Sequence, residues 1–449
     1  MWTRVKCIFA KQVKCVVLVS LSGVAVESAW ATVYVVDQRH GAASDANPGT
    51  ALMPFKTISR ATAVAAGGDR IVVKGGVYRE EVSFPQSGSP NRPLIVDAQQ
   101  NVVVSPPTVR HWTGAFNIIG RSDIIIRGFK VSDAYFGFKI DKDAAGTPSR
   151  RIVLANNHTR VTASSGIRVA FSQQVTVERN TVEKANYGGI HEMISVIDTD
   201  GFIVRGNHVF NGLWLRDGKP VEGKEGIDVK GSSRNGRVVA NRVHDLTRLG
   251  IYVDSYAGTL SNVKVTGNIV YRCKQGIAIS SEHGGPVSDV LISNNLVYNN
   301  INYGIIITNW TGGDSVGDAL RKNISIFNNT AYGNGTGGIR IGTRNIEGLN
   351  VANNIAAANK GAQLSALDIN VVTQSAANLI WSGPAGNVMM GTVTGDPLFV
   401  NPNLGDFRLR AASAAVDSGV TLNSVPRDAT GVQRPQGAAY DIGAHERVQ

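Results

Sequence analysis

The sequence predicts an all-β protein in which short strands wind into a parallel β-helix. Three observations predict this fold: a composition rich in glycine and poor in charge, a motif that recurs along most of the chain, and a repeat too short to contain a helix. Of 449 residues, 50 are Gly and 18% are charged. Coiled coils, disordered chains and long helical arrays need more charge or more Ala, Glu, Lys and Leu. The composition therefore favours many short strands joined by turns.

The recurring motif is apolar-x-apolar-x-x-Asn, followed after a short gap by Gly-Ile. Its Asn residues, spaced by 23 to 34 positions, are Asn157, Asn180, Asn207, Asn241, Asn268, Asn295, Asn329 and Asn354. The Gly residues of the Gly-Ile pairs are Gly166, Gly189, Gly226, Gly250, Gly276, Gly304 and Gly338. A unit this small cannot bury its own apolar face, so successive units must stack and share one core. We expect the stacked Asn side chains to form a hydrogen-bonded ladder along the stack.

The N-terminal segment has the pattern of a secretory signal peptide over residues 1–31. Four basic residues precede an apolar run at 16–26, and Ala29 and Ala31 are the small residues that a signal peptidase reads. The rest of the chain is expected to be secreted or periplasmic, with no further segment able to span a membrane. Removing the signal lowers the net charge from +11 to +8, which still favours an anionic partner.

The remaining chain is predicted to have three regions. Residues 32–100 form an N-terminal cap and the first coils, with a short amphipathic capping helix near 56–66. Residues 101–365 form the β-helix repeats and a groove, and residues 366–449 form the last coils and a closing segment. Because the coils share one core and the two ends are covered, we expect a monomer.

Segments at both ends also resemble a known family. Asp45-Ala-Asn-Pro-Gly-Thr50 and Pro54-Phe-Lys-Thr-Ile58 resemble the opening of family 9 polysaccharide lyases, and Asp396-Pro-Leu-Phe-Val-Asn401 resembles the closing segment of bacterial secreted β-helix proteins. With the repeats, the chain resembles secreted pectate lyases over nearly its whole mature length. The resemblance implies a right-handed, single-stranded parallel β-helix that acts on a polysaccharide. Since this fold hosts lyases, hydrolases, epimerases and adhesins, the chemistry must be inferred from individual residues.

Chemistry is expected where polar side chains point outward on neighbouring coils. Alternate residues of a strand face opposite sides, so with the Ile of each Gly-Ile pair in the core, the second and fourth residues after Gly point outward. On three consecutive coils these positions hold His191, then Asp228 and Lys230, then Tyr252 and Asp254. Coils lie about 4.8 Å apart, so these five side chains can reach a single sugar ring.

Five further residues extend this patch as candidate substrate-binding residues. Arg168 lies on the coil before it, and Glu282 and His283 lie on the coil after it. The two 34-residue Asn spacings mark insertions beside the same sheet, and these insertions carry Trp214 and Trp310. Insertions on both sides of the sheet would form the walls of a groove in which tryptophan rings stack on sugars.

β-Elimination is the reaction that we expect. It needs a base to remove the proton alpha to a uronate carboxylate, and Lys230 is predicted to be that base, with a pKa lowered by its surroundings. Arg168 or His191 would pair with the uronate carboxylate, and Tyr252 or His191 would protonate the leaving oxygen. The resemblance to family 9 lyases, which use a lysine and a calcium ion held by aspartates, implies that Asp228 and Asp254 hold a Ca²⁺ ion. The alternative interpretation of this patch is an inert ladder of surface ion pairs.

Two other functions remain open at this point. Hydrolysis uses two carboxyl groups, and diagonal neighbours on adjacent strands are about 7 to 8 Å apart, within the roughly 6.5 to 9.5 Å of inverting glycosidases. Asp228 with Asp254, or Asp254 with Glu282, would serve. A non-catalytic glycan-binding protein is the third possibility. The positive net charge favours elimination on an acidic, uronate-containing polysaccharide, and no nucleic-acid partner is predicted.

Overall fold

The computed structural model describes most of the chain after the predicted signal peptide. The described residues are 31–189, 191–216, 218–222, 224–310, 318–387 and 390–448, without the side chains of 213–216 and 220–222. Residues 1–30 of the predicted signal peptide lie outside the described residues. In the ranges above, no helix is both long enough and apolar enough to cross a membrane.

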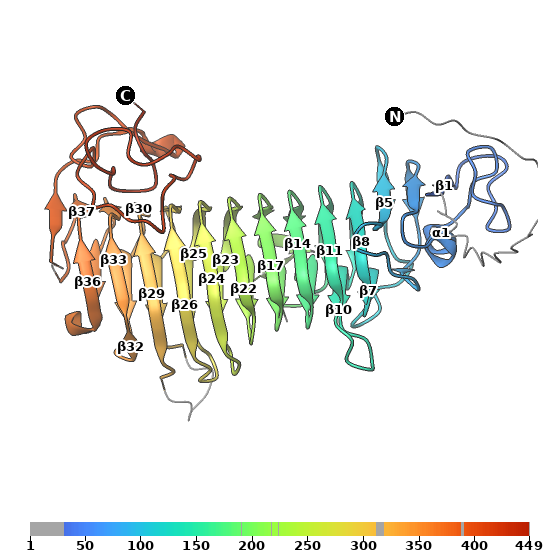
Figure 1. The fold of residues 1–449 in the computed structure, drawn as a ribbon, viewed down its shortest axis with the longest axis horizontal. Coiled ribbons are helices and arrows are strands. Elements are labelled where there is room, and N and C mark those ends of the chain that lie inside the picture. Colours follow the sequence, from blue (N-terminus) through green and yellow to red (C-terminus); the bar gives the residue numbers. More distant parts are fainter. Residues whose placement is uncertain are drawn as a thin grey trace, which may run out of the picture. The chain divides into compact units, whose positions relative to one another are not determined.

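Parallel strands stack coil upon coil in three files, which confirms the predicted parallel β-helix (Figure 1). The first file contains β1 (Val33–Val36), β2 (Arg70–Val73), β5 (Leu94–Ala98), β8 (Ser122–Arg127), β11 (Arg150–Ala155), β14 (Gln173–Glu178), β17 (Asp200–Arg205), β22 (Arg234–Val239), β24 (Leu260–Thr266), β26 (Val287–Ser293), β29 (Arg321–Phe327), β33 (Leu349–Ala352) and β36 (Val372–Ala376), with β32 (Ile346–Glu347) paired to β29.

The second file carries the patch predicted above. It contains β4 (Val82–Ser83), β7 (Gly114–Ile119), β10 (Phe136–Asp141), β13 (Ile167–Ala170), β16 (Ile194–Ile197), β21 (Ile227–Lys230), β23 (Arg242–Asp254), β25 (Ile269–Ser280), β28 (Tyr303–Thr308), β31 (Gly337–Gly342) and β35 (Leu364–Ala366). Strands β23 and β25 bend and also run through the third file, which otherwise contains β3 (Gly76–Tyr78), β6 (Val102–Val104), β9 (Lys130–Ala134), β12 (His158–Thr162), β15 (Thr181–Glu183), β18 (His208–Phe210), β27 (Leu296–Tyr298), β30 (Thr330–Tyr332), β34 (Ile355–Ala357), β37 (Asn378–Trp381) and β38 (Thr392–Thr394).

The remaining elements are two antiparallel hairpins and three short helices. The hairpins are β19 (Leu213–Arg216) with β20 (Lys219–Glu222), and β39 (Phe399–Asn401) with β40 (Asp406–Leu409). The predicted capping helix is α1 (Ile58–Val64), which packs against β1, β2 and β4, and the other two are 3-10 helices at Ile369–Val371 and Pro402–Leu404. Thr57 caps α1 by accepting a hydrogen bond from the Arg60 backbone N–H.

A continuous apolar core runs inside the coils because equivalent inward positions repeat the same residue type. One inward column of the second file consists of Ile167, Ile194, Ile227, Ile251, Ile277, Ile305 and Ile339, each at most 1% exposed. β-Branched side chains pack well on a pleated surface, and no single coil could bury them alone. Stacking therefore holds the strands in one register.

The predicted asparagine ladder is present and runs from Asn157 to Asn378. At each rung the backbone N–H and the side-chain amide of one Asn donate to the Oδ1 of the next; for Asn268 both bonds to Asn295 are 2.9 Å long. The Asn268 amide also donates to the carbonyl of Val238 at 2.9 Å. The ladder thus satisfies buried turn groups that a shorter side chain would leave unpaired.

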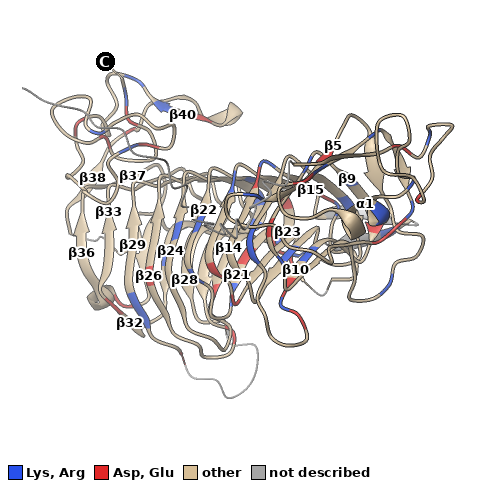
Figure 2. Cartoon of the chain, turned by 45° about the vertical axis from the view of Figure 1, so that its right-hand side comes forward, with Lys and Arg blue, Asp and Glu red and all other residues tan. Residues whose placement is uncertain are grey.

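Charged side chains contribute little to holding the coils together. Figure 2 shows acidic and basic residues next to one another around β10, β21 and β23, of which β21 and β23 carry residues of the predicted patch. On the first file, Asp97 pairs with both Arg70 and Arg127, whose side chains are 51% and 45% exposed. Exposed pairs of this kind contribute at most about 1 kcal/mol each.

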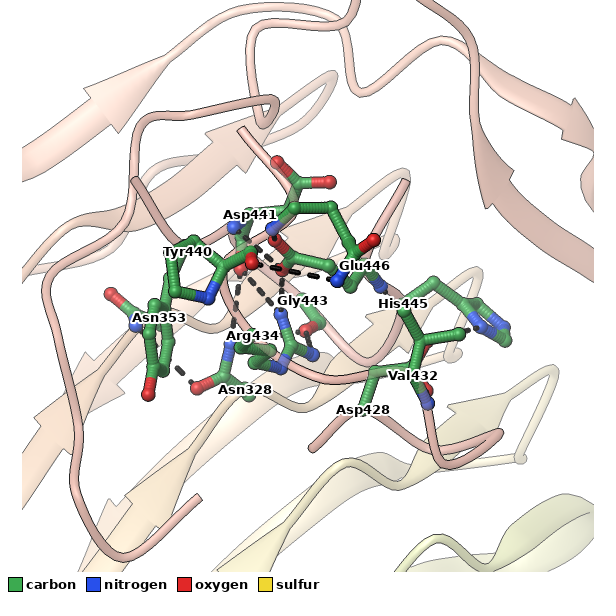
Figure 3. A network of polar contacts seen from close by, with 12 residues as sticks. Asn328, Asn353, Asp428, Val432, Arg434, Tyr440, Asp441, Gly443, His445 and Glu446 are labelled. Atoms are coloured by element: carbon green, nitrogen blue, oxygen red, sulfur yellow. Dashed lines mark hydrogen bonds and ion pairs between the residues drawn. The ribbon is translucent and has the colours of Figure 1, made fainter. Parts of the chain in front are cut away.

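The C-terminal segment is anchored to the flank of the last coils by residues that precede the ladder asparagines. Asn328 donates to the carbonyls of Asp441 and Gly443 at 3.1 and 3.2 Å, and Asn353 donates to the carbonyl of Val420 at 2.7 Å. Inside the segment Arg434 and Glu446, both fully buried, form an ion pair of 2.7 Å (Figure 3). The turns of the β-helix therefore use one Asn inward for the ladder and its neighbour outward for the closing segment.

Replacing one rung of the ladder should destabilise the fold strongly. We expect Asn268→Ala to lower the free energy of unfolding by at least about 3 kcal/mol, because the N–H of Asn241 and the carbonyl of Val238 lose their partners in a buried site. Asn350→Ala is the matched control, since that half-buried side chain makes a single long bond of 3.4 Å to Gly348. Urea denaturation followed by circular dichroism measures both, and equal midpoints for the two variants would contradict a structural role for the ladder.

Candidate active site

Outward side chains of the second file form two neighbouring columns. The first column aligns Lys139, Arg168, Ser195, Asp228 and Tyr252 on successive coils. The second column aligns Ile197, Lys230 and Asp254 on successive coils. It therefore begins with an apolar residue. The predicted juxtaposition of Asp228, Lys230, Tyr252 and Asp254 is therefore present.

The predicted strand position of His191 was wrong. The strand of this coil begins at Ile194, whereas Gly189-Ile190 was expected to start it, and Ile190 lies outside the described residues. Met193, expected to point outward, is fully buried in the core. His191 lies before the strand, where its backbone N–H donates to the side chain of Asn186 at 3.3 Å. It nevertheless lines the same cavity as the outward columns.

A cavity of about 450 Å³ opens over these coils. Most of its lining is ionisable, with Glu192, Asp198, Glu225, Asp228 and Glu282 as acids, His191, Lys224, Lys230 and Arg248 as bases, and two phenols, Tyr252 and Tyr256. Carboxyl groups outnumber the lysine and arginine side chains in this lining. The cavity lining is therefore rich in carboxyl groups within a protein of positive net charge.

One ammonium group, that of Lys230, lies between two buried carboxyl groups. It contacts Glu192 and, at 2.9 Å, Asp228, whose side chains are 7% and 2% exposed. Glu192 also accepts a hydrogen bond of 2.6 Å from the hydroxyl of Ser195. The Oδ1 atom of Asp228 is buried and has no hydrogen-bond partner among the described residues. One positive charge thus faces two carboxyl groups, which cannot both be neutralised.

The pKa values of Glu192 and Asp228 are shifted in opposite directions. Burial alone would raise the pKa of Glu192, but the Lys230 ammonium and the Ser195 hydroxyl hold it below its usual value. Burial, reinforced by the negative charges of Glu192 and Asp254, raises the pKa of Asp228 well above its usual value. The two pKa values are therefore shifted in opposite directions, toward the ionised form for Glu192 and toward the protonated form for Asp228.

Lys230 does not have the lowered pKa that was predicted for a base. Burial acts in that direction, but Asp228 and Glu192 outweigh it and raise the pKa of Lys230. An ammonium group that stays protonated cannot accept a proton from a substrate. Lys230 is a fixed cation that keeps Glu192 ionised, and the predicted base role is corrected accordingly.

Glu225 occupies the position of Glu192 on the next coil. Each glutamate lies two residues before an inward Ile, and these two residues, Ile194 and Ile227, pair in register. Burial, reinforced by Glu192 and opposed by Arg248, raises the pKa of Glu225 to about 7. Arg248 contacts Glu225 at 3.1 Å. The cavity thus contains two adjacent glutamates, one ionised and one protonated up to about neutral pH.

These two glutamates were not among the predicted catalytic residues. The sequence does carry a signal for them, because Glu192-Met-Ile-Ser-Val196 and Glu225-Gly-Ile-Asp-Val229 share the pattern Glu-x-Ile-x-Val. That pattern also gives the correct strand start at Ile194. Following the Gly-Ile signal alone led to the wrong register on this coil.

Asp254 and Tyr252 lie on the coil after Asp228 and Lys230 and complete the site. Burial raises the pKa of Asp254 to about 6, although its Oδ1 accepts backbone N–H bonds from Tyr256 and Glu282 at 2.8 and 3.2 Å. The Tyr252 hydroxyl donates to Glu282 at 3.4 Å, and burial raises its pKa. Tyr252 is therefore a neutral hydrogen-bond donor.

The predicted calcium site does not fit the residues present. Ca²⁺ prefers six to eight oxygen ligands. One oxygen of Asp228 is paired to the Lys230 ammonium, and Asp254 is occupied by backbone N–H groups. Across the described residues, no group of three or more His, Cys, Asp or Glu side chains is placed to hold a metal ion. The two aspartates belong instead to a buried cluster of carboxyl groups near the Lys230 ammonium.

The predicted substrate-binding residues lie in different surroundings. Trp310 contacts Tyr252 edge-on, with ring centroids 5.9 Å apart, and lines a second cavity of about 250 Å³ that adjoins the first at Arg248. The side chain of Trp214 lies outside the described residues. Glu282 lines the main cavity. His283 packs on Tyr256 at a centroid distance of 4.2 Å.

Arg168 is not available as a free cation for a substrate carboxylate. Its side chain is 6% exposed and forms an ion pair of 2.5 Å with Asp141. It lies on the coil before Ser195, beneath the aromatic rings of Trp112 and Phe136. Its charge is already neutralised within the protein.

Comparisons with known proteins agree with this architecture. Residues 156–318 match the family described as "Right handed beta helix region", and residues 41–236 match "Protein of unknown function (DUF1565)". Two solved structures share the fold: XylC in complex with xylose (13% identical, TM-score 0.63, 93% of this chain and 99% of that one) and pectate lyase Pel9A (16% identical, TM-score 0.57, 93% and 98%). At these identities the likeness concerns the fold alone.

A closer sequence relative is the uncharacterized protein YwoF of Bacillus subtilis (strain 168). The two are 30% identical over 329 residues, which cover 66% of this chain and 68% of YwoF. Together with the stacked parallel coils and the match to the right-handed β-helix description, this assigns both family and handedness. The chain is a right-handed parallel β-helix protein that belongs to the same family as YwoF.

Proposed function

We propose that the protein is a glycoside hydrolase that uses Glu225 as the general acid and Glu192 as the nucleophile. The observation that carries this proposal is the pair of glutamates on adjacent coils of one cavity with opposite protonation. Glycosidases need one protonated and one ionised carboxyl group on either side of the scissile bond. The fold is shared with XylC, which was solved with xylose, and with a pectate lyase, and the proposed substrate belongs to the same broad class of glycans.

The first chemical step follows from these two protonation states. Glu225, with a pKa near the working pH, donates its proton to the glycosidic oxygen as the bond to the anomeric carbon breaks. Glu192 supplies the negative charge that stabilises the developing oxocarbenium ion and bonds to the anomeric carbon. In the second step Glu225 takes a proton from water, which attacks this carbon and releases Glu192.

The spacing of the two glutamates favours retention of configuration. The backbone positions of Glu192 and Glu225 lie on adjacent coils, about 4.8 Å apart, so their carboxyl groups can approach the roughly 5 to 5.5 Å that separates the carboxyl groups of retaining enzymes. Inverting enzymes leave about 6.5 to 9.5 Å for a water molecule. The inverting arrangement expected for Asp228 and Asp254 is not favoured, because it needs one protonated and one ionised carboxyl group, whereas burial raises the pKa values of both aspartates.

β-Elimination is the second candidate, and the cations Lys224 and Arg248 in the cavity wall favour it. They could neutralise a uronate carboxylate, and Glu225 rather than Lys230 would then act as the base. Against it, the negative charge of Glu192 would repel a uronate carboxylate at the reacting centre. The two reactions give different products, because only elimination leaves an unsaturated sugar that absorbs ultraviolet light.

Glu192→Gln and Glu225→Gln should each lower turnover by about 10² to 10⁴, the usual contribution of an acid–base group. Purified protein would be incubated with a panel of neutral and acidic glycans while reducing ends and ultraviolet absorbance are followed. Glu183→Gln is the control, since Glu183 pairs with His158 and Arg160 on the third file. Wild-type turnover in either cavity variant would refute the assignment, and an absorbing product would replace hydrolysis by elimination.

The pH dependence should respond to Arg248. Activity should fall as pH rises through about 7, because Glu225 must be protonated to act as the acid. The positive charge of Arg248 lowers the pKa of Glu225, so Arg248→Gln should move this basic limb to higher pH. Arg272→Gln, which breaks a pair with Asp245 outside the cavity, should leave the limb in place. A downward or absent shift in Arg248→Gln would rule out Glu225 as the titrating acid.

A further inference from the structure

An exposed tryptophan lies at the N-terminal side of the candidate active site. Trp112 is 42% exposed and sits in the turn before β7 with a φ of +69°, a conformation that bulky residues rarely adopt. Its ring meets that of His191 edge-on, with centroids 5.3 Å apart, and His191 lines the main cavity. The tryptophan surface is thus continuous with the cavity that contains Glu192 and Glu225.

The surroundings of Trp112 hold the ring in place. It packs edge-on against Phe136 at 5.5 Å and tilted against Tyr135 at 6.2 Å. The guanidinium of Arg168, already paired with Asp141, lies 5.4 Å from the ring centroid. A ring fixed in this way loses little side-chain entropy when a ligand stacks on it.

A lysine beside this ring has no carboxylate partner in the described part of the chain. The ammonium of Lys139 lies 5.9 Å from the Trp112 ring centroid and donates to the Trp112 carbonyl at 3.0 Å. The described residues form no salt bridge with Lys139, and Asp141, the carboxylate that acts on it electrostatically, is already paired with Arg168. Lys139 therefore provides a positive charge next to an aromatic surface.

Lys139 belongs to the outward column that also contains Asp228, which lines the main cavity. Lys139, Arg168, Ser195 and Asp228 follow one another on successive coils, so Lys139 and Asp228 are about 14 Å apart along the stack. A single sugar cannot cover that distance. A ligand that reaches both places must be a chain of several sugars lying along the coils.

We propose that Trp112 and Lys139 form a distal subsite that stacks one sugar ring of an extended glycan and pairs with an anionic group on it. This inference rests on the proposed function for the statement that the ligand is a glycan. The aromatic face supplies contact area, and the ammonium selects a carboxylate or a sulfate over a hydroxyl group. The anionic sugar then lies away from Glu192, whose negative charge would repel it.

Binding is tested without turnover by affinity electrophoresis of the full mature chain in gels that contain polygalacturonate, dextran sulfate or dextran. The wild type should be retarded by one or both anionic polymers more than by dextran. Trp112→Ala should weaken that retardation about tenfold in apparent dissociation constant, and Trp112→Phe should restore most of it. Lys139→Gln should remove the preference for anionic polymers. The two anionic gels distinguish a carboxylate from a sulfate.

Trp381→Ala is the matched control, because that tryptophan is 36% exposed on β37, far along the coils from β7, and its loss should change nothing. Thermal denaturation of each variant checks that the fold is intact. Equal retardation of wild type and Trp112→Ala, equal retardation by dextran, or no retardation of the wild type would each overturn the subsite. Retardation that depends on Trp112 in a protein without hydrolytic activity would support the subsite while rejecting the proposed hydrolysis.

Discussion

Stacking of the coils in register is the constraint on which the rest of the structure depends. Each residue lies about 4.8 Å from its equivalent on the next coil, so any residue type that repeats becomes a column. Ile columns form the core, and Asn columns form the ladder from Asn157 to Asn378. The same constraint places Glu192 next to Glu225 in one cavity. Burial and the neighbouring charges then shift the pKa values of these two carboxyl groups in opposite directions.

Other parts of the fold supply the free energy that is needed to bury these charged groups. Glu192 and Asp228 are almost fully removed from water and Lys230 is partly so, and a buried ion pair by itself adds little or no stability. The apolar core and the ladder, which extend over coils with few charges, hold the backbone under the site. Local departures from ideal composition are expected at functional sites that a stable scaffold supports.

Much of the fold could be predicted from the sequence because the repeat is a local signal. The Gly-Ile pairs at Gly226 and Gly250 gave the register of Asp228, Lys230, Tyr252 and Asp254, which share one patch. The pair at Gly189 did not, since it precedes the strand that begins at Ile194. A periodic pattern identifies which residues face outward, but a Gly-Ile pair can also occur before a strand begins.

The protonation states and the distal tryptophan could not be predicted in the same way. The pKa of Lys230 depends on Glu192, which is 38 residues away in the sequence. Glu192 lies on the coil whose register was predicted incorrectly. Trp112 lies outside the repeats that were aligned, and its approach to His191 depends on loops whose path the sequence does not reveal. Charge and contact between coils are tertiary properties, whereas the coil repeat is a property of each segment.

The central claim is that Glu225 is protonated up to about pH 7 beside an ionised Glu192. Infrared difference spectroscopy of the protein between pH 6 and pH 8 tests it directly, because only a protonated carboxyl group gives the high-frequency C=O band. The account predicts that part of this band disappears over that interval in the wild type and is missing from Glu225→Gln, but persists in Glu183→Gln. Identical difference spectra for wild type and Glu225→Gln would contradict the account.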